Sequence, residues 1–146
     1  MSETIDAAIG VIEAAEVLDA PGYAIGKAIS RTGQITGEPG KGLADALHGR
    51  GYGHPVHPLV VAIPIGTWSL ALGLDLLSAA GLMKDPAGRR AADIALKAGS
   101  VGAVAAIATG LADWQHLNGR DRRVGLVHGS INATALGLNV ASSALR

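Results

Sequence analysis

The sequence contains no cysteine, so disulfide bonds, thiolate chemistry and thiolate metal sites are excluded. It also contains no phenylalanine, and tyrosine and tryptophan together make up only 3% of the residues. Because a water-soluble core of this size usually contains bulky aromatic side chains, their scarcity argues against such a core. Small residues replace them, with 21 glycines among 146 residues, and small residues suit helices that approach one another closely in lipid.

The sequence also carries no net charge. Twelve basic residues balance twelve acidic residues, so no overall field favours nucleic acid, and no nucleic-acid partner is expected. The N-terminal segment has no basic region and carries five acids before Pro21, which is not the pattern of a secretory signal peptide. The length and the apolar share of 49% fit a single domain.

Three stretches of the sequence are nearly free of charge. Residues 58–83 hold one charged residue, Asp75, and residues 98–112 and 124–145 hold none. A bilayer core needs about 20 mostly apolar residues, and the second stretch reaches that length if Lys97 extends its charged end to the surface. The sequence therefore predicts an all-α fold, an integral membrane helical bundle of three transmembrane helices preceded by amphipathic helices. A soluble helical bundle is the alternative, because the second and third stretches are only mildly apolar.

The chain divides near residue 52. Residues 1–52 are predicted to form amphipathic helices and a linker, with residues 32–42 (TGQITGEPGKG) as a loop, and residues 53–146 to form the three-span membrane domain. The first part suits a membrane surface, a partner protein or a soluble cap. Basic residues are in excess on the side of the N-terminus and the second connector, which predicts a cytoplasmic N-terminus. The two sets are Lys27, Arg31, Lys41, Arg50, Arg120, Arg122 and Arg123 against Lys84, Arg89, Arg90 and Arg146.

Polar residues gather at the ends of the predicted spans. Successive spans run in opposite directions, so spans one and three begin at the membrane face where span two ends. Polar side chains at that face would avoid lipid by meeting inside the bundle. Within this cluster, His57, Asp113, His128 and Asn132 are expected to form one contact shell, while Asp75 belongs to the opposite face. The whole predicted cluster comprises His54, His57, Asp113, Trp114, Arg123, His128 and Asn132.

Several interpretations of this cluster stay open. In the structural interpretation, Asp113 pairs with Arg123 or with an imidazole and fixes the register of the helices. In the redox interpretation, His57 and His128 are the axial ligands of a b-type haem. Both interpretations require the two histidines to approach each other within the bundle.

Two further interpretations involve ions. His54, His57 and His128 would supply a zinc or copper site, although a proline between the first two makes joint coordination awkward. Alternatively, protons or ions would move along His57, Asp113 and Asp75.

Catalysis by the chain itself is not expected. The serines lack a histidine and an aspartate partner at triad geometry, and GEPGKG at residues 37–42 lacks the spacing of a phosphate-binding loop. His48 and His116 are flanked by loop residues and are interpreted as ordinary surface histidines.

Small residues also recur at helical spacing. In the third span they occur every four residues and form a ladder against which the backbone of another helix can pack closely. The second span has a similar ladder. Two other spans cannot cover all of the third, and the polar atoms of Asn139, Ser142 and Ser143 would then face hydrocarbon. A protein partner or a second copy is therefore expected on the third span. The ladders comprise Gly125, Gly129, Ala133, Gly137 and Ala141, and Ala95, Gly99, Gly102, Ala103, Ala106 and Gly110.

From about Leu43 to Arg146, the segments GHPVHPLVVAIPIGTW, ATGLADW and RRVGLVHGSINATALGL occur in this order. They resemble a bacterial family of uncharacterised multi-span membrane domains, commonly joined to or encoded beside Rieske iron–sulfur domains. The resemblance implies the bacterial inner membrane and a non-catalytic subunit that assembles or anchors an electron-transfer complex. The family usually has a fourth span, which is absent here. Its polar signature falls on His54, His57, Asp75, Asp113, Trp114, His128 and Asn132.

Overall fold

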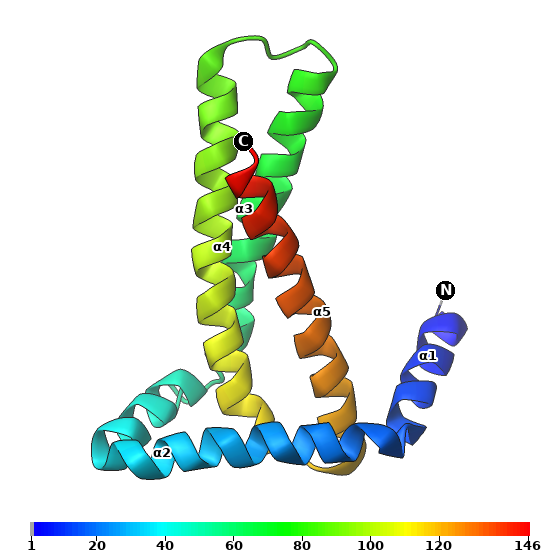
Figure 1. Cartoon of the computed structure of the whole chain (residues 1–146), viewed down its shortest axis with the longest axis vertical. Helices are drawn as coiled ribbons and strands as arrows, with labels where there is room; N and C mark the ends of the chain where they lie inside the picture. The colour runs from blue at the N-terminus through cyan, green and yellow to red at the C-terminus, as the bar shows by residue number, and fades with distance from the viewer. Residues whose placement is uncertain (1) are drawn as a thin grey trace. The chain divides into compact units, whose positions relative to one another are not determined.

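The computed structural model describes residues 2–146, apart from the side chains of Ser2, Gly33 and Gln34, and every regular element in that range is helical. The prediction of an all-α fold is therefore confirmed. In chain order the elements are α1 (Ser2–Ala14), the 3-10 helix η1 (Glu16–Leu18), α2 (Asp19–His48), α3 (His57–Ala79), α4 (Pro86–Trp114) and α5 (Gly119–Ala144) (Figure 1).

The chain forms two compact units. The first comprises Met1–Val56 with Thr109–Ile131, and the second comprises His57–Ala108 with Asn132–Arg146. Helices α4 and α5 contribute residues to both units.

In the second unit, α3 and α4 pack against each other along a face of small residues. Ala95, Ala103 and Ala106 of α4 are buried. A Cβ atom at Gly99 would lie 2.4 Å from Cδ1 of Trp68, so α3 approaches the backbone of α4 too closely for any larger residue. The small-residue ladder predicted for the second span is thus the contact face of α4.

Two of the described helices are long and apolar enough to cross a membrane, α3 with 23 residues and α4 with 29. Only 11% of the most apolar window of α3 is buried, which fits a helix surrounded by lipid better than the core helix of a soluble protein. Helix α5 has 26 residues but is not among these candidates. Its sequence explains this, because the polar residues Ser130, Asn132 and Thr134 interrupt the apolar ones.

In the first unit, α2 lies across the turn that joins α4 to α5 (Figure 1). The prediction of a loop at residues 32–42 is wrong, because α2 continues through them and departs from helical geometry only at Gly37, with φ 60° and ψ −145°. Glycine adopts this conformation without steric cost, and Pro39 then falls in the first turn after the break, where a missing N–H does no harm. The Glu38 carboxylate pairs with Lys41 at 2.6 Å across that same turn.

Candidate functional site

Arg122, in the first turns of α5, joins three helices of the first unit. Its guanidinium carbon lies 4.7 Å from the centre of the Trp114 ring and 5.0 Å from that of Tyr23. The guanidinium also donates a hydrogen bond to the carbonyl of Gly22 at 3.1 Å, and Trp114 Nε1 donates one to the carbonyl of Arg122 at 3.0 Å. A cation held between two aromatic faces is stabilised most when water is excluded, and Trp114 is only 7% exposed.

Glycines provide the space for this arrangement. A Cβ atom at Gly26 of α2 would lie 1.9 Å from Nη2 of Arg122, and one at Gly125 of α5 would lie 2.5 Å from Cδ1 of Trp114. Any side chain at these positions would displace the guanidinium or the indole. We call Gly22, Tyr23, Gly26, Trp114 and Arg122 the Arg122 cluster.

The neighbouring Arg123 attaches the start of α2 to α5. Its guanidinium donates two hydrogen bonds to the Asp19 carboxylate at 2.8 and 2.7 Å, and a third to the carbonyl of Glu13 at 2.6 Å. These hydrogen bonds lower the pKa of Asp19, while desolvation raises it and the charge of Arg123 lowers it further. Arg123 therefore pairs with Asp19 and not with Asp113, and both carboxylate oxygens of Asp19 accept hydrogen bonds from the planar fork of the guanidinium.

Asp113 pairs instead with an imidazole, that of His48 at the end of α2. His48 Nδ1 lies 2.6 Å from Oδ1 of Asp113, and the two side chains are 35% and 27% exposed. The ring of His116 lies next to that of His48, with the centroids 5.1 Å apart and the planes tilted by 57°. His48 thus differs from the expectation of an ordinary surface histidine. Its partner lies 65 positions further along the chain, so no local pattern indicated the pair.

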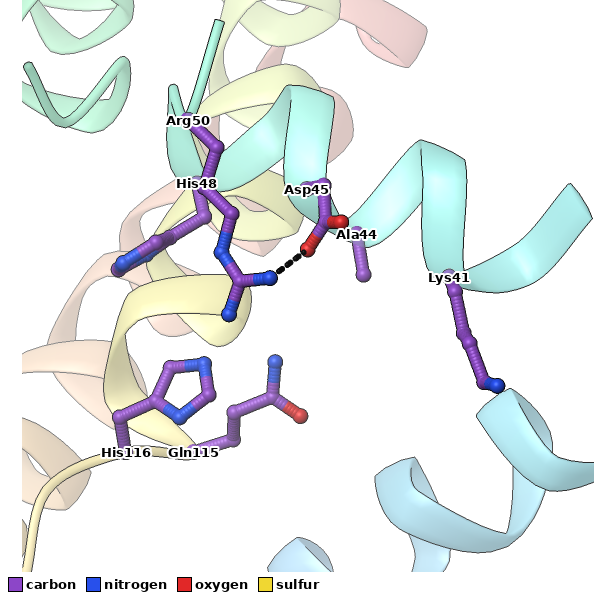
Figure 2. Close-up of a pocket in the computed structure, with 7 residues that line it drawn as sticks. All are labelled: Lys41, Ala44, Asp45, His48, Arg50, Gln115 and His116. Carbon is purple, nitrogen blue, oxygen red and sulfur yellow. Dashed lines mark ion pairs between the residues drawn. The ribbon is translucent and has the colours of Figure 1, made fainter. Parts of the chain in front are cut away.

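A pocket of about 260 Å³ opens beside this pair, between the end of α2 and the end of α4 (Figure 2). Arg50, at one side of it, forms an ion pair of 2.9 Å with Asp45. We call it the His48 pocket, and its lining residues are Lys41, Ala44, Asp45, His48, Arg50, Gln115 and His116.

Two further predicted site residues are His57 and His54. His57, in the second unit, is half-buried, and its Nδ1 lies 2.9 Å from the carbonyl of Ala106. His54 is exposed, and its own carbonyl would lie 1.9 Å from a Cβ at Gly49, which ends α2 with φ 82°. That close approach and the positive φ together require glycine there.

The contact shell of His57, Asp113, His128 and Asn132 stays a prediction. Asp113 and His128 belong to the first unit, and His57 and Asn132 belong to the second. Both His128 and Asn132 are exposed on α5.

Asp75 of α3 interacts within the second unit with Arg146, whose Nη1 lies 3.0 Å from Asp75 and 3.1 Å from Asp93 of α4. Among the described residues, no three His, Asp or Glu side chains come together as they would to hold a metal ion. A zinc or copper site at His54, His57 and His128 is therefore not proposed.

Residues 53–146, well over half of the chain, match the model of a family described as predicted membrane protein (DUF2231). The chain belongs to this family. No curated protein and no solved structure matches the chain.

The DUF2231 region, residues 53–146, contains Asp113, Trp114, Arg122 and Arg123, whereas α1 and α2 precede it. The Arg122 cluster and the two ion pairs of Asp19 and Asp113 therefore attach a preceding amphipathic segment to the DUF2231 region. Asp113, Trp114 and Arg123 were predicted as site residues from the sequence, whereas Arg122 and the contacting residues of α2 were not.

Proposed function

We propose that the chain is a non-catalytic subunit of the bacterial inner membrane that assembles or anchors an electron-transfer complex through α5. In this proposal α5 is the third transmembrane helix, and the N-terminus lies on the cytoplasmic side. One observation carries the proposal: Gly99 and Gly102 of α4 are covered by a neighbouring helix, whereas Gly129 and Gly137 of α5 are open.

The contrast is visible at individual glycines. At Gly99 and Gly102 of α4, a Cβ would meet Trp68 at 2.4 Å and Ile63 at 2.7 Å. At Gly129 and Gly137 of α5, no described atom lies within 4 Å of the same position. Because small residues in membrane helices serve close approach of another backbone, the open ladder on α5 favours an additional helix as its neighbour.

The polar residues of α5 add less to this argument than the sequence suggested. Asn139 donates a hydrogen bond to the carbonyl of Ala135 at 2.9 Å, so its side-chain amide has a hydrogen-bond partner within its own helix. The proposal therefore depends on the glycines. A heteromeric partner is favoured over a second copy, because the resemblance noted in the sequence implies a domain that serves an electron-transfer protein.

The pattern of residues along α2 supports the proposal that this helix, which precedes the DUF2231 region, lies parallel to the membrane surface. The face of α2 that receives Arg122 also carries Ile25 and Ile29, so apolar side chains point to the side on which α4 and α5 attach. The opposite face carries two cations that would remain in water. By helical spacing, the first face comprises Gly22, Ile25, Gly26 and Ile29, and the second comprises Ala24, Lys27, Ala28 and Arg31.

An environment-sensitive fluorophore tests this placement of α2. A label on Ile25→Cys should emit as in lipid when the protein is in vesicles, and a label on Ala28→Cys should emit as in water. Equal emission from the two positions would contradict an in-plane helix.

Native mass spectrometry in mild detergent tests the partner on α5. Gly129→Leu and Gly137→Leu should lose the partner when the protein is purified from its own membranes. Gly66→Leu on α3, where a Cβ also meets no described atom within 4 Å, provides the matched control and should keep it. Loss of the partner in all three variants, or in none, would count against the open ladder as its site.

A b-type haem held by His57 and His128 is the second candidate. The observation in its favour is the contact of His57 Nδ1 with the carbonyl of Ala106. Because a carbonyl only accepts, Nδ1 carries the proton and Nε2 of the neutral ring carries a lone pair, the arrangement common in iron-ligating histidines. When bound, such a haem would supply one-electron transfer.

Purified protein from haem-replete cells provides the test of this candidate. A Soret band and a stoichiometric pyridine haemochrome, lost in His57→Ala, would establish the haem. A colourless and folded preparation would exclude it and leave the assembly subunit.

A further inference from the structure

Hydrogen-bond donors line the His48 pocket, and the carboxylates at it are each paired within the chain. Two fixed cations, Lys41 and Arg50, and one carboxylate, Asp45, line it. Asp45 is paired with Arg50 at 2.9 Å, Lys41 is paired with Glu38 at 2.6 Å, and the nearby Asp113 is engaged by His48. Arg50 and Lys41 each carry further N–H donors beyond these pairs. A planar guanidinium beside imidazole rings is a donor set typical of sites that bind phosphate oxygens.

The donors come from two elements and face one space. Figure 2 shows the side chains of Arg50, His48, Gln115 and His116 around the same opening, from the end of α2 and the end of α4. Arg50 is 64% exposed over its side chain, so a ligand can reach it without rearrangement of the backbone. The volume of about 260 Å³ exceeds that of a single water molecule many times over and suits a headgroup-sized anion.

The surroundings indicate where such an anion would come from. Gln115 and His116 directly follow Trp114, the last residue of α4, and α4 is one of the two helices able to cross a membrane. The end of a membrane-spanning helix lies at the level of the lipid headgroups. Tyr52 and Leu43, close in sequence to the lining residues, are 78% and 62% exposed and would contact the interface beside a bound lipid.

We propose that the His48 pocket binds the phosphate-bearing headgroup of an anionic phospholipid. Basic pockets at the ends of membrane helices recognise such headgroups through charge and directed hydrogen bonds together. This inference depends on the membership in a membrane family and not on the proposed partner of α5. Loss of that partner would leave it unchanged.

The test uses the full chain in a neutral detergent, titrated with short-chain phosphatidylglycerol or phosphatidylcholine and followed by native mass spectrometry. The protein should retain one phosphatidylglycerol per chain and no phosphatidylcholine. Arg50→Gln should weaken retention about tenfold, because a charge-assisted hydrogen bond is lost. Arg31→Gln, which removes the same charge from an exposed position of α2, should change it less than about twofold.

A second variant separates the pocket from its charge. Ala44→Leu leaves every charge in place but fills part of the pocket, so it should weaken phosphatidylglycerol retention as Arg50→Gln does. Circular dichroism should confirm that each variant keeps its helices. Equal losses in Arg31→Gln and Arg50→Gln, or full retention in Ala44→Leu, would show general charge attraction and overturn the proposal.

Inorganic phosphate distinguishes the two sources of the ligand. In lipid-free detergent, millimolar phosphate should not raise the thermal unfolding temperature, whereas phosphatidylglycerol should. A rise with phosphate alone, abolished by Arg50→Gln, would identify a free anion as the ligand and overturn the assignment to lipid.

Discussion

Trp114 Nε1 donates a hydrogen bond to the backbone carbonyl of Arg122 at 3.0 Å, and the guanidinium of the same Arg122 lies over the Trp114 ring. Each residue thus fixes the other across the turn between α4 and α5. Because Arg122 also binds the carbonyl of Gly22, this turn provides the attachment point of α2. The helix that precedes the DUF2231 region is held by these contacts of Arg122, together with the ion pairs of Arg123 with Asp19 and of Asp113 with His48.

Two substitutions of Trp114 separate the contribution of its hydrogen bond from that of its aromatic ring. Trp114→Phe keeps an aromatic face for Arg122 but removes the Nε1 donor, and should cost about 1 kcal/mol of unfolding free energy. Trp114→Ala also removes a buried ring and should cost about 3–5 kcal/mol. Thermal or denaturant unfolding in mild detergent measures both.

Trp68 provides the control for the hydrogen bond. Its Nε1 is buried without a hydrogen-bond partner among the described residues, so Trp68→Phe loses no such bond and should cost less than Trp114→Phe. If the two substitutions cost the same, the hydrogen bond of Trp114 contributes nothing of its own.

Gly26→Ala should loosen α2. The added methyl group would lie 1.9 Å from Nη2 of Arg122, so the guanidinium must move and give up the carbonyl of Gly22, at a cost of about 1–2 kcal/mol. Hydrogen exchange should show faster exchange in α2 while α3 is unchanged. Gly42→Ala, where no described atom lies within 4 Å of the Cβ, should stabilise the same helix by about 0.5–1 kcal/mol.

The pair of His48 and Asp113 should contribute modestly. Both side chains are partly exposed, at 35% and 27%, so water screens the pair and a cost of several kcal/mol is not expected from Asp113→Asn. A double-mutant cycle with His48→Gln should give a coupling free energy of about 0.5–1 kcal/mol. Strictly additive effects would mean that the 2.6 Å contact does not couple the two residues in solution.

Stability should fall in acid because of Asp19. Its pKa is lowered in the folded protein from the ordinary value of 3.8, chiefly by the hydrogen bonds from Arg123. A lowered folded pKa gives stabilisation that is complete above about pH 4–5 and is lost as the pH falls through the folded value. Asp19→Asn and Arg123→Gln should each flatten this acid limb in unfolding measurements between about pH 5 and 2. Curves that stay parallel to that of the unmodified chain would refute the assignment.

Much of the architecture could be predicted from the sequence because charge-free stretches and small-residue spacing are local properties. Residues 58–83 indicated α3, and the ladder around Gly99 and Ala103 indicated the face that α3 covers. The course of α2 could not be predicted, since glycine and proline at residues 37–40 signal a loop unless tertiary contacts hold both sides.

The candidate site was predicted only in part, because the local sequence does not show its long-range contacts. Asp113, Trp114 and Arg123 stood out because they end or begin apolar stretches, which is visible in the sequence. Their partners Asp19 and His48 lie on an amphipathic helix whose position depends on long-range packing. Arg122 was expected at the same membrane face as these residues, but nothing in the local sequence indicates that glycines on α2 make room for it.

Photo-crosslinking from Ala133 tests the central claim most directly. A photoreactive residue at this exposed position of the α5 ladder should crosslink in native membranes to a protein of an electron-transfer complex. The same probe at Val101, an exposed position of α4, should label only lipid. If Ala133 also labels only lipid and the chain runs as a folded monomer, α5 has no partner and the proposed function is wrong.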